Sequence, residues 1–475
     1  MVSINKDEQQ ETSDYVNMET AVWRESDESE DDFSLAPSIV SVMSADGIYD
    51  TTGFMCICFV TFIGDMTRGV FFPSLWLFVE HLGGSTVTLG YAVAAFSFGR
   101  ILVNPLFGSW SQTIGYKKTL LIACLILLLG TVLYAVTFIV GQPTFLVFAQ
   151  TVLGIGSGTL GVTRAFLAEI TPQRNRTTYM AWLTATQYAG FAVTPIAGAF
   201  FNYLFRDATG FLNMYTAPAF FMGSIVLATT LTIARFFEGN THSELVQPKD
   251  SIKKSRRKQE LERVASEIIP VIGLSFYSCC VVGCMLLNTT TTGSIASFET
   301  LGIKIAESHF GMLSTRAGLF VGICGSIGVL SLLSIGYISR LISSDVHLII
   351  GGVTVMAFSS AVFMTLEEGA GEYVGTNPTW KYCTSVFLMY AIGYPLGHTA
   401  VIGLFSKVVG RRPQGTLQGW YASAGSLARV VFPLLSGYIL KFKDVETLFG
   451  IITFVLILSA LTVLYFQKSL TFLSS

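Results

Sequence analysis

The sequence predicts an all-α membrane protein with twelve transmembrane helices in two six-helix halves. Three observations support this fold class. Of the 475 residues, 51% are hydrophobic and only 13% are charged, whereas a soluble domain carries about 25% charged residues. Twelve apolar runs are long enough for a bilayer-spanning helix, which needs about 20 residues. Lys and Arg gather in alternate connections between these runs, which indicates an even number of crossings.

The first six apolar runs fill the N-terminal half of the chain. Small residues and Pro inside them fit membrane helices, because small side chains let such helices approach closely. The runs are too long and continuous for a β-barrel, whose strands alternate over about ten residues. We place the first six helices at roughly 53–79, 87–107, 119–139, 144–168, 178–204 and 212–235.

A polar segment at 239–266 separates these runs from six more. We interpret this basic segment as a solvated linker, and the alternative is a surface helix on anionic lipid. The later helices are expected at roughly 268–292, 311–335, 346–366, 380–406, 417–440 and 446–467. The predicted division is a tail at 1–50, a first half at 51–238, the linker, a second half at 267–468 and a tail at 469–475.

Charge is unevenly placed along the chain. The first 50 residues hold 13 of the 31 acidic residues beside only Lys6 and Arg24, and the remainder has a net charge of +9. Nineteen Lys and Arg residues lie in the termini and even-numbered connections, against five in the odd-numbered connections. Because Lys and Arg favour cytoplasmic loops, we expect both termini in the cytoplasm. We interpret the acidic tail as a disordered regulatory or sorting segment.

Ionised side chains at bilayer depth are costly and therefore mark candidate functional sites. In mid-membrane there are five Arg against one Asp, and a cavity of net positive potential favours anions. We expect Arg429 to contact an anion, since guanidinium binds carboxylate or phosphate through two parallel hydrogen bonds. The alternative partners of Arg429 are Asp65 or backbone carbonyls. The charged residues within or at the ends of the runs are Asp65, Arg68, Arg100, Arg164, Glu169, Arg316 and Arg429.

Further candidates for the central site lie on the first, fifth and tenth runs. Asp65 and Arg68 are three residues apart and share a helix face, so they can pair. This pair is either a charge site tuned by substrate or proton, or a self-neutralising structural pair. His398 is a candidate proton carrier, because histidine titrates near the acidity of late compartments; its alternative role is hydrogen-bonded packing. Tyr188 and Tyr394 are candidate cavity-lining residues.

The remaining charged residues are candidates for gates at the two ends of the helices. Arg164 and Glu169 lie toward the cytoplasmic end of the fourth run, where a gate pair or a snorkelling charge is expected. Arg100 is expected to act structurally at the cytoplasmic gate. Arg316 is expected near the lumenal end of the eighth run, with Glu299 as its partner or as a lumenal gate.

The connection after the second run carries a recognisable motif. It reads Gly108-Ser-Trp-Ser-Gln112-Thr-Ile-Gly115-Tyr-Lys117-Lys118. This resembles the loop signature of the major facilitator superfamily, G-x-x-x-D-x-x-G-R-K. The superfamily's Asp is Gln112 here, and its usual Arg in the fourth helix is Gln150, so the roles of those two residues do not carry over.

Two groups of short motifs, between Gly154 and Pro218 and between Ser406 and Arg429, are more specific. They resemble the lysosomal branch of the superfamily typified by ceroid-lipofuscinosis neuronal protein 7 (major facilitator superfamily domain-containing protein 8). The first group is also similar to vacuolar phosphate transporters. The resemblance implies two halves that rock around a midplane site in an endolysosomal or vacuolar membrane.

We therefore expect a transporter that moves a small, anionic solute by alternating access. An anion (chloride) channel on the same fold and a solute sensor that does not transport remain alternatives. The expected partners are the lipid bilayer and the solute, with a monomeric chain and no nucleic acid. No enzyme constellation or Walker loop is present. The eight Cys residues lie in or beside apolar runs without a His or acid cluster, so no metal and no cofactor are expected.

Overall fold

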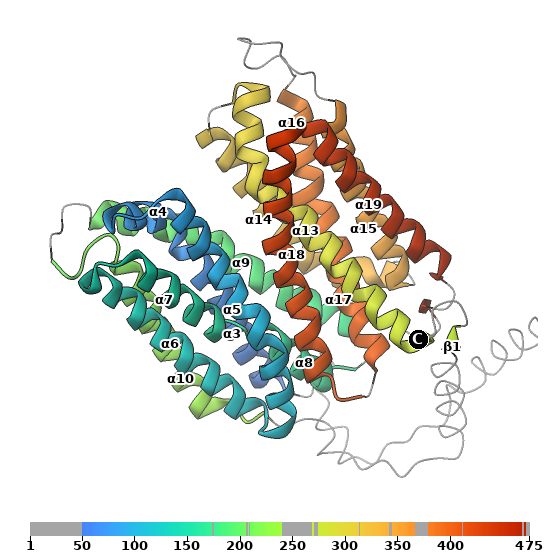
Figure 1. Cartoon of the computed structure of the whole chain (residues 1–475). Coiled ribbons are helices and arrows are strands. Elements are labelled where there is room, and N and C mark those ends of the chain that lie inside the picture. Colours follow the sequence, from blue (N-terminus) through green and yellow to red (C-terminus); the bar gives the residue numbers. More distant parts are fainter. Residues whose placement is uncertain are drawn as a thin grey trace, which may run out of the picture. The chain divides into compact units, whose positions relative to one another are not determined.

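The computed structural model describes residues 50–172, 175–205, 208, 210–239, 268–269, 274–312, 314–341, 344–365, 379–410, 412–467 and 470–471. Two helical bundles make up this part of the chain, one running from α3 to α10 and the other from α13 to α19 (Figure 1). Nearly all of the predicted acidic tail and of the linker lie outside the described residues. The alternative of a basic surface helix in the linker is therefore untested.

The first bundle holds the first six predicted helices. The first run is divided into two helices at Phe71, because Pro73 occupies the first turn of a new helix, a position where proline is tolerated. The fourth run is likewise divided by a bend at 157–159. The elements are α3 (Thr51–Val70), α4 (Phe72–His81), α5 (Thr86–Thr113), α6 (Tyr116–Val140), α7 (Pro143–Gly156), α8 (Leu160–Ile170), α9 (Arg176–Leu204) and α10 (Ala217–Phe236).

The second bundle follows a two-residue antiparallel pair, β1 (Ile268–Ile269) with β2 (Leu274–Ser275). Its tenth predicted helix contains a π-helical turn, η3. The elements are α13 (Phe276–Phe310), α14 (Ser314–Leu341), α15 (Asp345–Val362), η2 (Phe363–Thr365), α16 (Thr379–Phe387), η3 (Leu388–Gly393), α17 (Tyr394–Val409), α18 (Gly415–Phe442) and α19 (Val445–Tyr465).

The predicted bounds of the seventh helix, 268–292, are wrong. The helix begins at Phe276 and continues to Phe310. The Thr-rich stretch after Leu287 stays helical because its hydroxyls bond to carbonyls one turn earlier, as Thr291 Oγ1 does to the Leu287 oxygen at 2.8 Å. Such bonds satisfy the hydroxyls without help from water. As a consequence, Glu299 lies inside this helix rather than beyond it.

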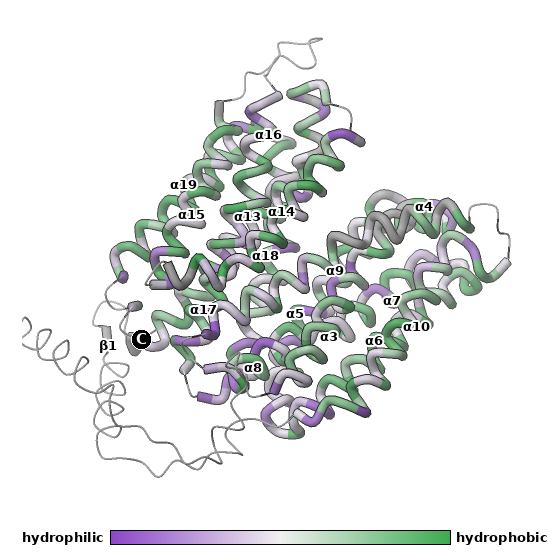
Figure 2. The backbone as a smooth tube through the Cα atoms, turned by 180° about the vertical axis from the view of Figure 1, so that it is seen from behind, coloured by the Kyte–Doolittle hydropathy of each residue, from purple (hydrophilic) through white to green (hydrophobic). Residues whose placement is uncertain are grey.

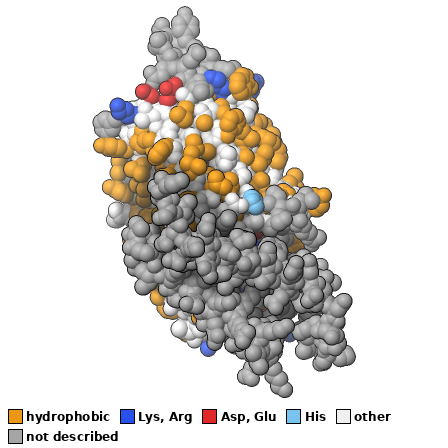
Figure 3. Space-filling model, turned by 90° about the vertical axis from the view of Figure 1, so that its right-hand side faces the viewer, with side chains coloured by type: hydrophobic (Ala, Val, Ile, Leu, Met, Phe, Trp, Pro, Cys, Tyr) orange, Lys and Arg blue, Asp and Glu red, His pale blue; other side chains and the backbone are white. Residues whose placement is uncertain are grey.

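The described helices have the dimensions and surface of membrane spans. Eleven helical segments among them are long and apolar enough to cross a bilayer. The 29-residue α9 completes the set of twelve by length, although polar side chains such as Thr184 and Gln187 lower its hydropathy. Figure 2 shows hydrophobic residues along much of α6, α10 and α19, and hydrophilic residues around α8. On the face in Figure 3, hydrophobic side chains cover the described surface, and acidic and basic side chains gather at its upper edge. The predicted all-α fold class is confirmed.

The two bundles contact each other through helices that occupy equivalent places in the two halves. The second helix of the first half, α5, packs against α18, and the second helix of the other half, α14, packs against α9. Each contact thus joins the second helix of one half to the fifth helix of the other. Additional contacts join α8 to α18 and α9 to α17.

Glycines allow the backbones of the two halves to touch. A Cβ on Gly108 would collide with the Gly415 carbonyl oxygen, and a Cβ on Gly419 would collide with the Asn104 carbonyl oxygen. Gly161 likewise faces the Gly419 backbone. Because only glycine permits such close approach, these residues close one end of the protein. We call Gly108, Gly161, Gly415 and Gly419 the glycine seal.

Candidate functional site

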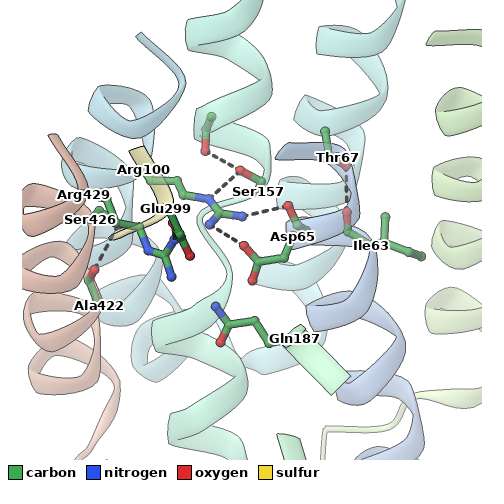
Figure 4. Close-up of polar contacts among 12 residues, drawn as sticks. Ile63, Asp65, Thr67, Arg100, Ser157, Gln187, Glu299, Ala422, Ser426 and Arg429 are labelled. Carbon is green, nitrogen blue, oxygen red and sulfur yellow. Dashed lines mark hydrogen bonds and ion pairs between the residues drawn. The ribbon is translucent and has the colours of Figure 1, made fainter. Parts of the chain in front are cut away.

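A buried ion pair joins α3 to α5. Arg100 Nη1 donates to Asp65 Oδ1 at 2.9 Å, Nε donates to Ser157 Oγ at 2.9 Å, and Nη2 donates to the Gly64 carbonyl at 2.7 Å (Figure 4). The side chains of Arg100 and Asp65 are only 7% and 5% exposed. All three nitrogens of this guanidinium are therefore occupied, and they tie α3 and α5 to the bend between α7 and α8.

The predicted pairing of Asp65 with Arg68 is wrong. Residues three positions apart point about 60° away from each other around a helix, which is enough for these two side chains to meet different neighbours. Asp65 meets α5, whereas the Arg68 guanidinium lies 5.4 Å from the centre of the Phe191 ring on α9, as in a cation–π contact. Arg100 also differs from expectation, because it faces α3 rather than the Gly108 loop.

Arg68 has a second polar neighbour on α7. Arg68 and Gln150 line one small pocket together with the apolar side chains of Phe71 and Phe96. Gln150 occupies the place of the superfamily's helix-four Arg, so the cation in this region comes from α3 instead. Four charged residues interact electrostatically with Arg68: Asp65, Arg100, Glu299 and Arg429.

A second ion pair joins α18 to α13. Arg429 Nη1 lies 3.2 Å from Glu299 Oε2, and the side chains are 18% and 26% exposed (Figure 4). The Tyr394 phenol is a further polar neighbour of Arg429. The alternative partners considered for Arg429 were Asp65 or backbone carbonyls, but its ion-pair partner among the described residues is Glu299. The predicted pair of Glu299 with Arg316 is therefore wrong. The reason is the length of α13, which keeps Glu299 inside the helix and beside Arg429, in the middle of α18.

Arg164 is buried on α8, with only 5% of its surface exposed. Its Nη2 lies 3.4 Å from Gln187 Oε1, and its guanidinium lies 5.9 Å from the centre of the Tyr421 ring. Glu169 instead accepts a hydrogen bond of 2.7 Å from the Tyr116 hydroxyl. The predicted Arg164–Glu169 gate pair is therefore wrong, and Arg164 does not reach the surface as a snorkelling charge would.

The aromatic candidates meet where the halves face each other. The rings of Tyr188 and Tyr394 are 5.6 Å apart, and His398 stacks on Tyr394 at 4.7 Å. His398 Nδ1 also lies 3.1 Å from Thr291 Oγ1. The buried Tyr188 hydroxyl has no hydrogen-bond partner among the described residues. The structure thus brings Tyr188, Tyr394 and His398 together.

The central charges do not balance. The pairs Asp65–Arg100 and Glu299–Arg429 each join one cation to one anion. Within the described ranges, Arg68 and Arg164 form no ion pair with a carboxylate. Removing a charge from water costs several kcal/mol unless it is compensated. Among the described central residues, positive charges therefore exceed negative charges by two, and an anion can neutralise such an excess.

The loop motif lies beside the glycine seal. Gln112 Oε1 accepts a hydrogen bond of 3.2 Å from Thr416 Oγ1, in the first turn of α18. Gln112 therefore contacts the opposite half although it lacks the charge of the superfamily's Asp. Gly115 has a φ of +91° just before α6, a conformation that favours glycine. Lys117 and Lys118 follow in the first turn of that helix.

A polar latch at the same end was missed by sequence reasoning. Asp345 Oδ2 accepts from Lys407 Nζ at 2.5 Å and from Thr177 Oγ1 at 3.0 Å. Arg176 Nη1 donates across the halves to the Ser406 carbonyl at 3.1 Å. These residues lie at helix ends, where we counted Lys and Arg only as loop charge. We call Asp345, Lys407, Thr177 and Arg176 the latch.

Comparison with known proteins decides the family. Residues 57–433 match the model of the Major Facilitator Superfamily. The chain belongs to the major facilitator superfamily. The predicted membership is confirmed, and this superfamily member is accordingly a multi-pass membrane transporter.

Individual relatives agree with this assignment. The superfamily member is 24% identical over 458 residues to major facilitator superfamily domain-containing protein 8 of Xenopus laevis, across 84% of this chain and 88% of that protein. It is 23% identical to the class E tetracycline resistance protein of Escherichia coli, across 80% and 86% of the two chains. The predicted resemblance to the branch of major facilitator superfamily domain-containing protein 8 is confirmed.

Solved structures share the fold. The human organic anion transporter MFSD10 (TETRAN) superposes with a TM-score of 0.66 at 15% identity, across 87% of this chain and 99% of that chain. The transporter FucP in its outward conformation superposes with a TM-score of 0.62 at 13% identity, across 86% and 98% of the two chains.

Proposed function

We propose that this superfamily member moves a small anionic solute across an endolysosomal or vacuolar membrane by alternating access. The observation that carries the proposal is the excess of two positive charges, at the buried Arg164 and the half-buried Arg68. A bound anion compensates such charges where the described carboxylates do not. The similarity to an organic anion transporter and to the branch of protein 8 supports the solute class and the compartment.

The solute site is proposed between the two halves, at the level of Arg68 and Arg429. Arg429 uses one nitrogen for Glu299, so other N–H groups of its guanidinium remain for an anion. Tyr188 and Tyr394 come from opposite halves and meet beside this level. They are positioned to cover the solute with their rings.

The glycine seal and the latch are proposed to form the gate at one end. Both join the two halves, and both must separate before a solute at the centre reaches that end. The charge distribution of the loops supports placing this end in the cytoplasm, together with both termini. The chain is proposed to work as a monomer of two halves, at 51–238 and 267–468.

The proposal is tested by uptake into proteoliposomes that contain the full chain, with chloride, inorganic phosphate and succinate as probes. We expect saturable uptake and counterflow for at least one probe, and loss of at least about 90% of it, a tenfold effect, in Arg68→Gln and Arg429→Gln. Arg235→Gln is the matched control, because Arg235 is exposed at the end of α10. Unchanged uptake in both central variants overturns the proposal. Large voltage-driven currents without counterflow identify an anion channel instead.

A further inference from the structure

We propose that Ser423 is a positioning residue for transport, because its hydroxyl completes a proline-broken helix of the opposite half only while the glycine seal is closed. The inference rests on the alternating access of the proposed function and adds a contact that opposes opening. Pro105 lies inside α5 and has no N–H, so the carbonyl of Ile101, four residues earlier, has no partner in its own helix. Ser423 Oγ on α18 donates a hydrogen bond of 2.8 Å to that carbonyl.

The bond from Ser423 crosses between the halves, unlike a similar bond elsewhere in the protein. The carbonyl of Ala391, four residues before Pro395, accepts a hydrogen bond of 2.7 Å from Ser331 Oγ on α14. Hydroxyls that replace a missing N–H in this way are what make prolines tolerable in membrane helices. Since Ser331 and Ala391 belong to the same half, rocking of the halves leaves their bond intact, whereas it separates Ser423 from Ile101.

The surface of α18 fits the proline at two successive turns. Gly419 and Ser423 are four residues apart and therefore share a helix face. A Cβ on Gly419 would lie 2.8 Å from the Pro105 Cα, so only glycine lets α18 approach the proline this closely. One turn later Ser423 reaches the Ile101 carbonyl, and only 5% of its surface is exposed. In the closed form the freed carbonyl therefore depends on this hydroxyl rather than on bulk water.

The equivalent joint between α9 and α14 is built differently. Trp182 Nε1 on α9 lies 3.4 Å from the Leu333 carbonyl on α14. The residue four positions after Leu333 is Tyr337, which has a backbone N–H, so this carbonyl has a donor in its own helix. Separation of α9 from α14 thus leaves the Leu333 carbonyl with a partner, and the dependence on the opposite half is specific to the joint of α5 with α18.

The bond from Ser423 favours the closed form of this end. When the halves separate, the Ile101 carbonyl loses its partner and needs water or a changed bend of α5 at Pro105. In Ser423→Ala the carbonyl is without this partner in the closed form as well, so the closed form loses its advantage. Because a buried polar group without a partner is costly, we expect the ratio of open to closed forms to rise about tenfold.

The test is hydrogen–deuterium exchange of the purified full chain in lipid nanodiscs, with no solute added. In Ser423→Ala, the backbone amides around the glycine seal should exchange about tenfold faster than in the wild-type chain. Alternating access closes one end as it opens the other, so the amides at the opposite ends of α5 and α18 should exchange more slowly. A merely structural loosening would not slow exchange at either end.

Two further variants assign the effect to the proline and to the crossing between halves. Pro105→Ala restores an N–H for the Ile101 carbonyl, so adding Ser423→Ala to it should change exchange by less than about twofold. Ser331→Ala is the matched control, because it removes a bond of the same kind within one half. It should leave exchange at the glycine seal unchanged.

Four results overturn the inference. They are unchanged exchange at the glycine seal in Ser423→Ala, faster exchange at both ends, an equal effect in Ser331→Ala, and an undiminished effect in the Pro105→Ala background. If Pro105→Ala does not fold, the first three results still decide. Because exchange is measured without a solute, absence of flux for every anion probe rejects the proposed solute class and leaves this contact to be judged by exchange alone.

Discussion

Two ion pairs at the centre of this transporter contain the same chemical groups but have different surroundings. Arg100 uses all three of its nitrogens, and both it and Asp65 are almost completely buried. Arg429 uses one nitrogen for Glu299, and both side chains are part-exposed (Figure 4). The comparison teaches that the number of remaining donors, rather than the presence of a charge pair, distinguishes a structural arginine from one available to a ligand.

The first test of this comparison removes the carboxylate of the Asp65–Arg100 pair, in which every guanidinium nitrogen is hydrogen-bonded. Asp65→Asn leaves the buried Arg100 without its counter-charge, and breaking such a pair costs about 3–5 kcal/mol. We expect this loss in the unfolding free energy of the purified protein, measured by thermal unfolding in detergent. The double variant Asp65→Asn with Arg100→Gln should recover part of it, since the uncompensated charge is gone. A single variant as stable as the wild-type chain would show that this pair does not hold α3 to α5.

A second experiment tests the glycine seal independently of the two ion pairs. Gly419→Ala places a Cβ against the Asn104 backbone, and overpacking of this kind costs about 1–3 kcal/mol. Because the cost arises only when this end is closed, we expect uptake to fall by about tenfold while anion binding to Arg429 persists. The measurement is proteoliposome uptake beside a thermal-shift Kd.

Gly437 provides the matched control on the same helix. A Cβ on Gly437 has open space around it, so Gly437→Ala should retain uptake and gain up to about 1 kcal/mol of helix stability. If both alanine variants transport equally well, the close approach of α5 and α18 is not part of the transport cycle.

The fold could be predicted well from the sequence because hydropathy and loop charge are properties of whole helices and loops, not of single residues. A run of about 20 apolar residues can be recognised without knowing which helices pack beside it. Every predicted run except the seventh therefore corresponds in position to a helix or to paired helices of the structure. The seventh helix is displaced because threonines that look polar in sequence bond back to their own helix, as Thr291 does.

The partners of the central charges were not predictable in the same way. The spacing of Asp65 and Arg68 describes a single helix, whereas the true partner of Asp65 lies 35 residues away on α5. Arg429 and Glu299 are 130 residues apart. Sequence reasoning identified most of these residues as costly charges, but only the packing of helices decides which charges meet.

The smallest expected effect concerns the part-exposed pair of Arg429 and Glu299. It is also the most direct test of the difference between the two pairs. Glu299→Gln removes a carboxylate that is 26% exposed, and ion pairs open to solvent contribute about 0–1 kcal/mol. We therefore expect its unfolding free energy to fall by no more than about 1 kcal/mol, in the same thermal measurement as for Asp65→Asn. A loss as large as that of Asp65→Asn would mean that Arg429 is as dependent on its carboxylate as Arg100. The two pairs would then be equivalent structural contacts, and the number of remaining donors would not distinguish them.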